Sequence, residues 1–562
     1  MEDRTRLSMT GGLQAKVKSI ANRLAPRGQK ATDAPQLSQA VPLLGHSIEF
    51  VRGTLDLLFR AERELGEVAA FRVAGRRMVA LFGPDAHAAV FRAPDSELDP
   101  SDAYAIMTPV FGEGMVYDAS PDRMAQQFKM LIPALKDARM RTYGDVVGKE
   151  VADSVASWGD SGEIELVSYF RTLTNYTSSH CLIGKEFRER LTSEFASVYH
   201  DLERGVTPLA YIDAHLPLPS FRRRDRARVR MVDMIGSIMR ERQQSSVRGE
   251  DFLQTLMEAA YADGSRLTEH EVTGMLLSAM FAGHHTSSVT SSWTLIELIR
   301  NPGYLARVLA ELDAVYGAGR PIDFASLREI PLTEYAVKEA LRLHPPLFML
   351  VRVAKRDFKY KEYVFPAGTW LVVSPTVSHR LPSVFADPNR FDPDRFGPGR
   401  EEDKREFSYI PFGGGHHRCL GNAFALLQIK AIVAFLLRRY EFTLGSDVIR
   451  PDFHGLVIGP AEPCHVQYRR RVLPVPIETS HAASSDGSGG AAAASTRPLR
   501  VVVDTDFCQG HAVCVSEAPE VFAIGDDGKV KLLDVSPSEA AVPGVVLAAR
   551  HCPTGSIRLE KT

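Results

Sequence analysis

The residue best suited to chemistry in this sequence is Cys419, within the stretch FSYIPFGGGHHRCLGNAF at 407–424. Glycines at 413–415 and Gly421 flank it, and glycine lets a backbone approach a flat group closely and turn its amides toward the sulfur. An apolar, helix-like segment follows at once. A thiolate that accepts hydrogen bonds at a helix start is stabilised as the anion, which is the form that binds a metal.

Three other interpretations of this cysteine are weaker. A lone cysteine is most often a small buried hydrophobic residue, but the surrounding glycines argue against plain packing. No CxxC or HxxxH spacing that would suggest a zinc site lies nearby. The triple glycine lacks the Lys-Ser/Thr ending of a phosphate-binding loop. A metal-ligating thiolate is therefore the favoured hypothesis.

Two further stretches carry candidate residues. In KEALRLH, Glu339 and Arg342 share one helix face and can pair, although such a pair is more often a solvated surface salt bridge. In MFAGHHTSS, a glycine inside an apolar helix costs about 1 kcal/mol against alanine and so needs a reason. Adjacent histidines on a helix diverge by about 100°, so we expect that His284 and His285 do not easily share one metal. His284 is expected to be an ordinary packed residue, whereas His285 could supply protons near neutral pH.

Another candidate metal set lies near the C-terminus. Cys508 and Cys514 are followed far downstream by Cys552 in a Cys-Pro pair, a spacing that resembles small bacterial ferredoxins. A cubane cluster needs a fourth cysteine between the first two, and His511 stands at that position. The resemblance therefore implies a 3Fe-4S cluster held by three thiolates. A zinc site that adds His511 to the three cysteines is the alternative.

The elements that position these residues are mostly helical between 41 and 473. Segments such as GMLLSAMFAG, TLIELIR and YLARVLAELDAVYG carry apolar residues at i, i+3, i+4 spacing, and short strand-like pieces such as TWLVVSP intervene. We expect a mainly α fold with small β-sheets there. Residues 1–40 are expected to be a flexible lead-in, 474–497 a Ser/Gly/Ala-rich linker, and 498–562 a small α+β ferredoxin-like domain.

Composition bounds the function. The chain has 562 residues, 44% hydrophobic and 24% charged, with a net charge of −2, so nothing indicates a nucleic-acid partner. Six cysteines in this length exclude a disulfide scaffold and fit a reducing compartment, and Cys181 and Cys464 are expected to be structural. The polar N-terminus lacks a signal-peptide core and no run of 18 apolar residues occurs, so we expect a cytoplasmic protein without a transmembrane anchor.

The motif F-x-x-G-x-H-x-C-x-G in the cysteine loop resembles the haem-binding signature of cytochromes P450. The resemblance implies that the cysteine ligates the iron of haem b, that the histidine reaches a propionate, and that the phenylalanine packs beneath the ring. An axial thiolate pushes electron density onto the iron and favours O–O cleavage. The residues that it assigns to haem binding are Phe412, Gly415, His417, Cys419 and Gly421.

Two other segments occur in the order that this family has. Arg395 in FDPDRF would complete a Glu-Arg-Arg network with Glu339 and Arg342 under the haem. The stretch AGHHTSS would admit O2 above the iron, where Thr286 steers protons to the bound oxygen. Most of the family has an acidic residue directly before this threonine, whereas this chain has His285. With histidine at that position, the stretch AGHHTSS resembles the corresponding stretch of sterol 14α-demethylases.

The stretch YAIMTPVFGEGMVYDAS at 104–120 is also similar to the signature of sterol 14α-demethylases. The resemblance places Tyr104 at the haem periphery and Arg352 on a propionate. The residues that it places around the substrate are Ile106, Met107, Phe111, Ala282, Leu347, Phe348, Met349 and Leu350.

The resemblance implies a sterol 14α-demethylase with a fused ferredoxin. Three successive oxygenations with O2 would remove the 14α-methyl group of lanosterol or another 4-methyl sterol as formate, leaving a C14–C15 double bond. No GxGxxG follows a strand, so electrons from NAD(P)H would arrive through an external flavoprotein reductase. Sterol uptake would be compatible with a weak peripheral membrane contact. Oxygenation of another terpenoid or fatty acid, or a haem-thiolate sensor without turnover, stays open, although Thr286 and the attached donor count against a sensor.

The C-terminal region also predicts where the two parts meet. Residues 498–562 contain nine acidic and six basic residues, a net charge of −3. We expect this acidic module to dock on the cysteine side of the haem, where Arg418, Lys404 and Arg405 offer positive charge.

Overall fold

The structure is a computed structural model. It describes residues 33–135, 137–189, 193–206, 210, 213–245, 251–317, 319–446, 448–453, 457–472, 499–505, 508, 510, 512–526, 528–552 and 556–561. Nearly all of the expected lead-in, the whole expected linker at 474–497, and His511 lie outside these residues.

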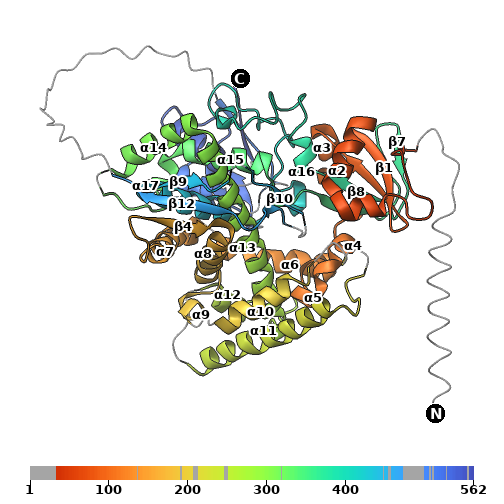
Figure 1. The fold of residues 1–562 in the computed structure, drawn as a ribbon, viewed down its shortest axis with the longest axis horizontal. Coiled ribbons are helices and arrows are strands. Elements are labelled where there is room, and N and C mark those ends of the chain that lie inside the picture. Colours follow the sequence, from red (N-terminus) through yellow and green to blue (C-terminus); the bar gives the residue numbers. More distant parts are fainter. Residues whose placement is uncertain are drawn as a thin grey trace, which may run out of the picture.

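The helical body is built around α13 (Glu269–Arg300), which runs through its centre (Figure 1). Thr268 and Glu271 form a capping box at its start, each side chain accepting a hydrogen bond from the other residue's amide. Side chains are buried on several faces of α13, as expected for a helix enclosed by others. The helices that contact it include α8 (Leu166–Leu182), α11 (Pro219–Gln244), α15 (Pro331–Leu343) and α17 (Asn422–Arg439).

Five strands form a sheet in a lobe beside this body (Figure 1): β1 (Val68–Val73), β2 (Arg76–Leu81), β3 (Leu98–Asp99), β5 (Leu350–Ala354) and β8 (Trp370–Val373). Their order is β1-β2-β8-β5-β3; β2 and β8 are parallel and the other neighbours antiparallel. Ala74 and Gly75 join β1 to β2 with φ of 47° and 75°, the two-residue turn whose twist suits a hairpin.

The remaining elements of the body are short or peripheral. The helices are α2 (Ser47–Leu65), α3 (Pro84–Arg92), α4 (Ser101–Tyr104), α5 (Thr108–Phe111), α6 (Pro121–Leu131), α7 (Asp137–Ser154), α9 (Lys185–Glu189), α10 (Ser193–Glu203), α12 (Phe252–Glu258), α14 (Pro302–Tyr316) and α16 (Pro375–Ser378). Single 3-10 turns are η1 (Ala105–Met107), η2 (Val116–Asp118), η3 (Ile132–Leu135), η5 (Ser326–Glu329), η6 (Pro393–Phe396) and η7 (Gly415–His417). The smaller sheets are β4 (Ser161–Glu165) with β12 (His465–Arg470) and β9 (Tyr440–Leu444), β6 (Phe358–Tyr360) with β7 (Tyr363–Phe365), and β10 (Pro451–Asp452) with β11 (Gly459–Pro460).

The C-terminal module has its own elements and its own core. Strand β13 (Leu499–Val503) pairs with β16 (Ile557–Lys561), and β14 (Phe522–Ile524) pairs with β15 (Val530–Leu532), both antiparallel. Two helices, α18 (Val513–Glu517) and α19 (Val542–His551), complete it. Its hydrophobic cluster draws only on residues after 498, so the module packs as a unit. The expected fold class, a mainly α body with small sheets and a small α+β domain, is confirmed.

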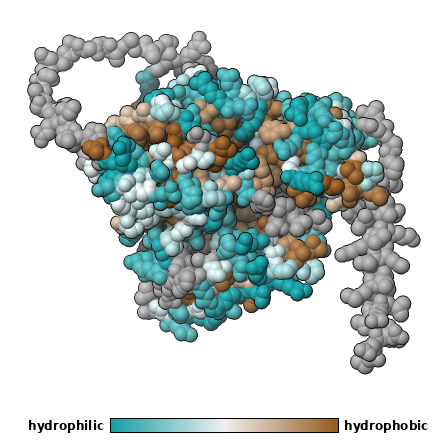
Figure 2. All heavy atoms as spheres, in the orientation of Figure 1, coloured by the Kyte–Doolittle hydropathy of each residue, from teal (hydrophilic) through white to brown (hydrophobic). Residues whose placement is uncertain are grey.

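On the face shown in Figure 2, polar residues are interspersed with several patches of apolar residues. Segment 41–51 is one place where they gather, and its exposed apolar residues are Val41, Leu43, Leu44, Ile48 and Val51. None of the helices in the described part of the chain combines the length and the hydropathy that crossing a bilayer requires.

Candidate functional site

The cysteine loop ends where α17 begins, so its sulfur lies at a helix start as the sequence predicts. The Cys419 amide donates to the Phe412 carbonyl at 2.9 Å, which closes the loop, and the Gly421 amide donates to the sulfur. Burial raises the pKa of the Cys419 thiol, while the Gly421 amide and the charge of Arg418 act in the opposite direction. The Cys419 side chain is nevertheless solvent-accessible, so this deep thiol faces an open space rather than packed side chains.

Glycine is required at position 415 because the loop is pressed against α3. Gly415 has a φ of +66°, and a Cβ there would lie 1.8 Å from the Phe91 carbonyl oxygen. His417, two residues on, lies close to Asp95, with Nε2 and Oδ1 2.6 Å apart. Its other ring nitrogen, Nδ1, is buried without a hydrogen-bond partner among the described residues.

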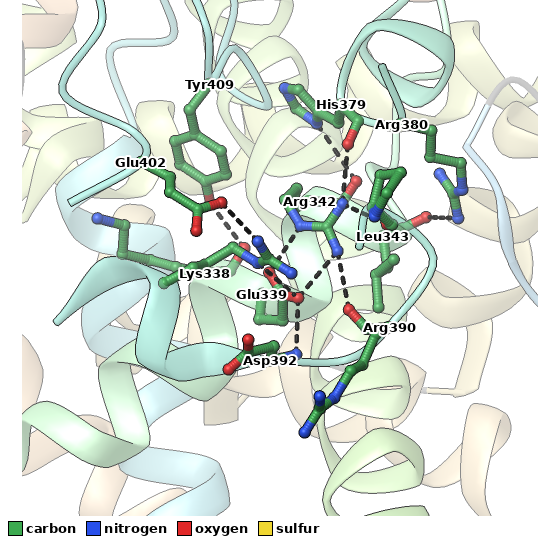
Figure 3. A network of polar contacts seen from close by, with 12 residues as sticks. Lys338, Glu339, Arg342, Leu343, His379, Arg380, Arg390, Asp392, Glu402 and Tyr409 are labelled. Carbon is green, nitrogen blue, oxygen red and sulfur yellow. Dashed lines mark hydrogen bonds and ion pairs between the residues drawn. The ribbon is translucent and has the colours of Figure 1, made fainter. Parts of the chain in front are cut away.

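Beside the loop lies a buried charge network (Figure 3). Arg342 donates to both Glu339 oxygens, at 2.7 and 2.9 Å, and Arg395 donates to Oε1 of the same carboxylate at 3.1 Å. All three side chains are fully buried, so this is not the solvated surface pair that a Glu/Arg spacing usually means. The second contact of Arg395 is Glu402, at 2.5 Å. The carbonyls that accept from Arg342 are those of His379, Pro388 and Arg390.

His379, which sequence reasoning did not single out, links this network to the cysteine loop. The Ile410 amide donates to Nε2 of His379 at 2.9 Å, so that nitrogen must be the acceptor. Nδ1 then carries the proton and lies 3.3 Å from the Arg342 carbonyl. Burial and the charge of Arg342 lower the pKa of His379 well below its ordinary value, so the ring is neutral.

On α13 the helix is continuous through the AGHHTSS stretch. Thr286 donates its hydroxyl proton to the Ala282 carbonyl at 2.6 Å, the usual contact of a threonine inside a helix. Ala282 is exposed although it lies in the middle of α13, and with Cys419 it shows that the interior of the body holds accessible space.

The two adjacent histidines of α13 converge on one group, although neighbouring positions on a helix diverge by about 100°. Both reach one carboxylate, Glu203 at the end of α10: His284 Nδ1 lies 3.2 Å and His285 Nε2 2.7 Å from Oε1. They converge because one ring uses its near nitrogen and the other its far nitrogen, which compensates for the 100° divergence of their Cβ atoms. Burial disfavours the Glu203 charge, but the two histidines outweigh it and lower the pKa to about 2. Sequence reasoning missed Glu203, because nothing links it to residues 81 positions away.

Near the thiol, Tyr104 stacks on Tyr117, with ring centroids 4.7 Å apart. Burial and then the charge of Tyr104 raise the pKa of Tyr117, the charge of Arg352 lowers it, and the charge of Cys419 raises it. Arg352 is buried and donates to the Val351 carbonyl at 2.9 Å. Tyr117 lies inside the segment at 104–120 that the sequence indicated but was not itself singled out.

The predicted substrate-lining residues do not form one cluster. Ile106 packs in a group with Ala210, Ala214 and Phe221, and Met107 borders it. Phe111 belongs to the cluster of α11 and α13 and meets the Phe281 ring edge-on. The other predicted residues lie next to the five-stranded sheet. Phe348 and Met349 belong to one hydrophobic cluster there, Leu350 packs against a second cluster, and Leu347 is half-buried.

The three cysteines of the module lie close to one another, and none of them forms a disulfide among the described residues. Burial, and then the charges of Cys552 and Cys508, raise the pKa of Cys514 to about 12. The Val530 amide lies 3.2 Å from the Cys508 sulfur, a contact typical of sulfurs that hold a cluster. All three belong to or border the module's core, and His511 lies outside the described residues.

The module contacts the body on the side of Cys419. The ion pairs there involve other residues than the predicted docking cations Lys404 and Arg405. Arg328 of η5 pairs with Glu517 of α18, and Arg558 of β16 lies between Asp504, at 3.3 Å, and Glu406 of the body, at 4.0 Å. Burial lowers the pKa of Arg418, whereas the charges of Cys552 and Cys419 raise it.

Two of the three predicted docking cations are paired within the body instead. Lys404 pairs with Glu401, and Arg405 with Asp85 at 3.0 Å. Both cations are thus paired locally, and the ion pairs that join the module to the body among the described residues are formed by Arg328 and Arg558.

Comparisons with known proteins agree with this geometry. A family model described as Cytochrome P450 matches residues 35–466, and one described as 4Fe-4S single cluster domain matches 501–559. The chain is 44% identical over 448 residues to the sterol 14alpha-demethylase of Mycobacterium tuberculosis (strain ATCC 25618 / H37Rv), covering 78% of this chain and 99% of that protein. It is 36% identical over 449 residues to the human lanosterol 14-alpha demethylase, covering 79% and 88%.

A solved structure shows the same fold. That of cyanobacterial CYP120A1 with bound retinoic acid has a TM-score of 0.71 at 22% identity, covering 79% of this chain and all of that one.

Proposed function

The chain belongs to the cytochrome P450 family, a haem monooxygenase with an iron–sulfur domain on the same chain, and from this premise we propose that it removes the 14α-methyl group of lanosterol-type sterols. Three successive oxygenations would take the methyl group through alcohol and aldehyde to formate, leaving a C14–C15 double bond. The accessible thiol of Cys419 at the start of α17 is the observation that carries the proposal.

We assign the haem to the space that this thiol faces. Cys419 would ligate the iron, with the loop of Phe412, Gly415 and Gly421 beneath the ring. When bound, a haem held by a thiolate supplies oxygen activation. The chain supplies polar groups for the ring edge, which are His417 Nδ1, Arg352 and Tyr104.

The buried network has a positioning role in this proposal. Glu339 binds two arginines that in turn hold the carbonyls of the chain before the cysteine loop, and His379 ties the network to Ile410. The network would therefore keep the Cys419 sulfur in place by holding its loop, and the network itself would not touch the substrate.

On the oxygen side, we assign proton handling to Thr286 and His285. The Thr286 hydroxyl donates to its own helix, so its oxygen is oriented to accept a hydrogen bond. His285, one residue before it, is held by Glu203. A proton passing from the His285 side would be relayed by the Thr286 hydroxyl or by a water beside it.

The substrate assignment to a 4-methyl sterol rests on apolar surroundings and on the relatives. Ile106, Met107 and Phe111 approach from the helical side, and Phe348 and Met349 from the sheet lobe. The relatives that span nearly all of the body are named for 14α-demethylation of sterols. The exposed apolar segment at 41–51 would give a weak peripheral contact with the lipid surface that holds such a substrate.

Electrons would come through the module, from NAD(P)H by way of an external flavoprotein reductase. The sequence has only three cysteines after position 464, which favours a 3Fe-4S cluster over the four-iron type in the family's description. Electron paramagnetic resonance of the oxidised protein tests this, because the three-iron cluster is paramagnetic in that state and the four-iron cluster is not.

A spectral titration of the purified protein with lanosterol tests the function. Displacement of water from the ferric haem would shift the Soret band toward the high-spin position, and reductase-driven turnover should yield formate and the 14-demethylated sterol. A spin shift with a fatty acid or another terpenoid, and none with sterols, would favour oxygenation of that substrate. Tight binding without product under turnover conditions would favour a sensor.

A further inference from the structure

The cluster of Glu203, His284 and His285 holds three potential ligand atoms close together. One carboxylate oxygen and two ring nitrogens, from α10 and α13, lie within 4.8 Å of one another. His284 is buried, whereas the side chains of Glu203 and His285 are 9% and 28% exposed, so the cluster is reachable from one side. Such a combination of two imidazoles and one carboxylate is a donor set that suits zinc and its neighbours in the transition series.

The hydrogen bond on the far side of His284 decides its tautomer. Nε2 lies 2.8 Å from the Arg171 carbonyl oxygen, which can only accept, so Nε2 carries the proton. In a neutral ring, Nδ1 then presents a lone pair to Glu203 at 3.2 Å, where the carboxylate also presents lone pairs. Two acceptors this close need a cation between them, either a proton or a metal ion.

The surroundings match those of a metal ligand. A metal-ligating histidine almost always donates its other N–H to a carbonyl or carboxylate, as His284 does to Arg171. Tyr199 packs edge-on against the His284 ring, with centroids 5.6 Å apart. Its hydroxyl is buried, has no hydrogen-bond partner among the described residues, and lies near enough to Glu203 for their charges to interact. A water bound to a metal at this place would give that hydroxyl a partner.

We propose that Glu203, His284 and His285 form a binding site for a divalent transition-metal ion of the zinc class, with a fourth position open to water. At Zn–N and Zn–O distances of about 2.0–2.2 Å, tetrahedral ligands are separated by about 3.3–3.5 Å. The carboxylate and His284 already lie at 3.2 Å, and His285 has to withdraw from 2.7 Å by about 0.6–0.8 Å to reach that separation.

The site has a consequence for catalysis that rests on the proposed function. Metal binding would occupy the His285 nitrogen and the Glu203 oxygen that handle protons next to Thr286. Bound zinc would therefore slow turnover while leaving sterol binding in place. The binding of zinc itself does not depend on what the enzyme oxidises.

Zinc binding to the full-length holoprotein, haem and cluster in place, tests the proposal by competition with a chromogenic chelator. Wild type should bind Zn²⁺ at one site that is at least about tenfold weaker in Glu203→Gln and in His285→Gln. His465→Gln is the matched control, because His465 and Glu163 form an exposed pair at 3.1 Å to which the described residues add no third ligand. This control should keep the wild-type affinity, and the reduced carbon-monoxide spectrum of each variant shows that it is folded.

Anomalous scattering at the zinc edge from soaked wild-type crystals provides a second measurement that no folding defect can confuse. A peak between the three side chains supports the site. Equal zinc affinity in wild type and both cluster variants, or no peak at this position, means that the cluster holds only a proton, and the proposal is then wrong. If zinc binds there while sterol is not demethylated, the proposed function fails and the metal site stands.

Discussion

At the scale of single residues, the chemistry depends on a few atoms that the fold keeps accessible. The Cys419 sulfur accepts from the Gly421 amide and remains open to the interior space, unlike Cys181 and Cys464, which are buried. Burial raises the pKa of Cys464 to about 11, so that thiol stays protonated and inert. Position, and not residue type, separates the ligand from the packing residues.

Replacing Cys419 by alanine should abolish the thiolate-type band in the carbon-monoxide difference spectrum of the reduced protein, because it removes the exposed sulfur at the start of α17. Cys464→Ala is the matched control and should keep the band. If the band persisted in Cys419→Ala, this cysteine would not be the iron ligand.

Ile106 offers a test of substrate choice. It is 5% exposed and packs against Ala210, Ala214 and Phe221, so a larger side chain has little room to turn away. Ile106→Phe should shift preference from lanosterol toward sterols with one methyl at C4, by roughly 10–200-fold in the ratio of kcat/KM values. Ile106→Leu, of equal volume, should leave the ratio near that of wild type. An unchanged ratio in Ile106→Phe would show that this residue does not sort sterols.

At the scale of elements, close approach between helices explains one glycine and leaves another unexplained. A Cβ on Gly274 of α13 would lie 2.4 Å from the Phe111 carbonyl oxygen in α5, a backbone atom that cannot turn aside. A Cβ on Gly283 would meet only ordinary contacts at 3.6 Å. The glycine in the AGHHTSS stretch is therefore not required by packing within the described chain.

Gly274→Ala should lower the free energy of unfolding by about 1–3 kcal/mol, because α13 and α5 must move apart. Gly283→Ala should change it by less than about 1 kcal/mol, in the stabilising direction, through its higher helix propensity. Thermal unfolding followed by circular dichroism at a fixed scan rate measures both. Equal melting temperatures for the two variants would contradict the assigned contact.

The α15–η6 network makes a similar contrast between buried and exposed charges. Glu339→Gln leaves two fully buried arginines without their shared carboxylate and should cost about 3–5 kcal/mol, with loss of haem retention. Glu329→Gln breaks an exposed pair with Arg320, 51% and 38% accessible, and should leave the free energy of unfolding nearly unchanged. Denaturant unfolding and haem content measure the outcome, and a small loss in Glu339→Gln would show that the network does not hold the loop.

At the scale of the whole molecule, the acidic module and the helical body meet near the iron ligand through opposite charges. The pair of Arg328 and Glu517 is partly buried, and Arg558 reaches across to Glu406. In this arrangement, Cys552 of the module and Cys419 of the body both lie near enough to Arg418 for their charges to raise its pKa. Such a contact between the module and the body supports electron transfer within one chain.

Arg328→Glu should weaken the contact between the module and the body by about 1 kcal/mol, which is roughly fivefold in its equilibrium constant. Reductase-driven reduction of the haem in dilute protein should then be slower. The double variant Arg328→Glu with Glu517→Arg restores opposite charges and should recover the rate. Wild-type reduction should slow as salt rises, since exposed charges beyond about 10 Å are screened at 0.1 M. Stopped-flow spectroscopy measures these rates, with the lanosterol spin shift as a control that should not change. No recovery in the double variant would mean that this pair does not seat the module.

The sequence by itself determined the features that depend on local spacing. The cysteine loop and its helix, the Glu339 and Arg342 pair on one helix face, the three module cysteines and the mainly helical class all follow from residues within a few positions of one another. Periodicity and short motifs carry this information because helix geometry and ligand spacing repeat along the chain.

Only the tertiary structure decided what residues distant in sequence do together. It brought Glu203 to His284 and His285, inserted His379 between Arg342 and Ile410, and stacked Tyr117 on Tyr104. It also paired two predicted docking cations, Lys404 and Arg405, within the body. These contacts depend on how helices and loops pack in three dimensions, and the pattern of a single element carries no record of its partner's side chains.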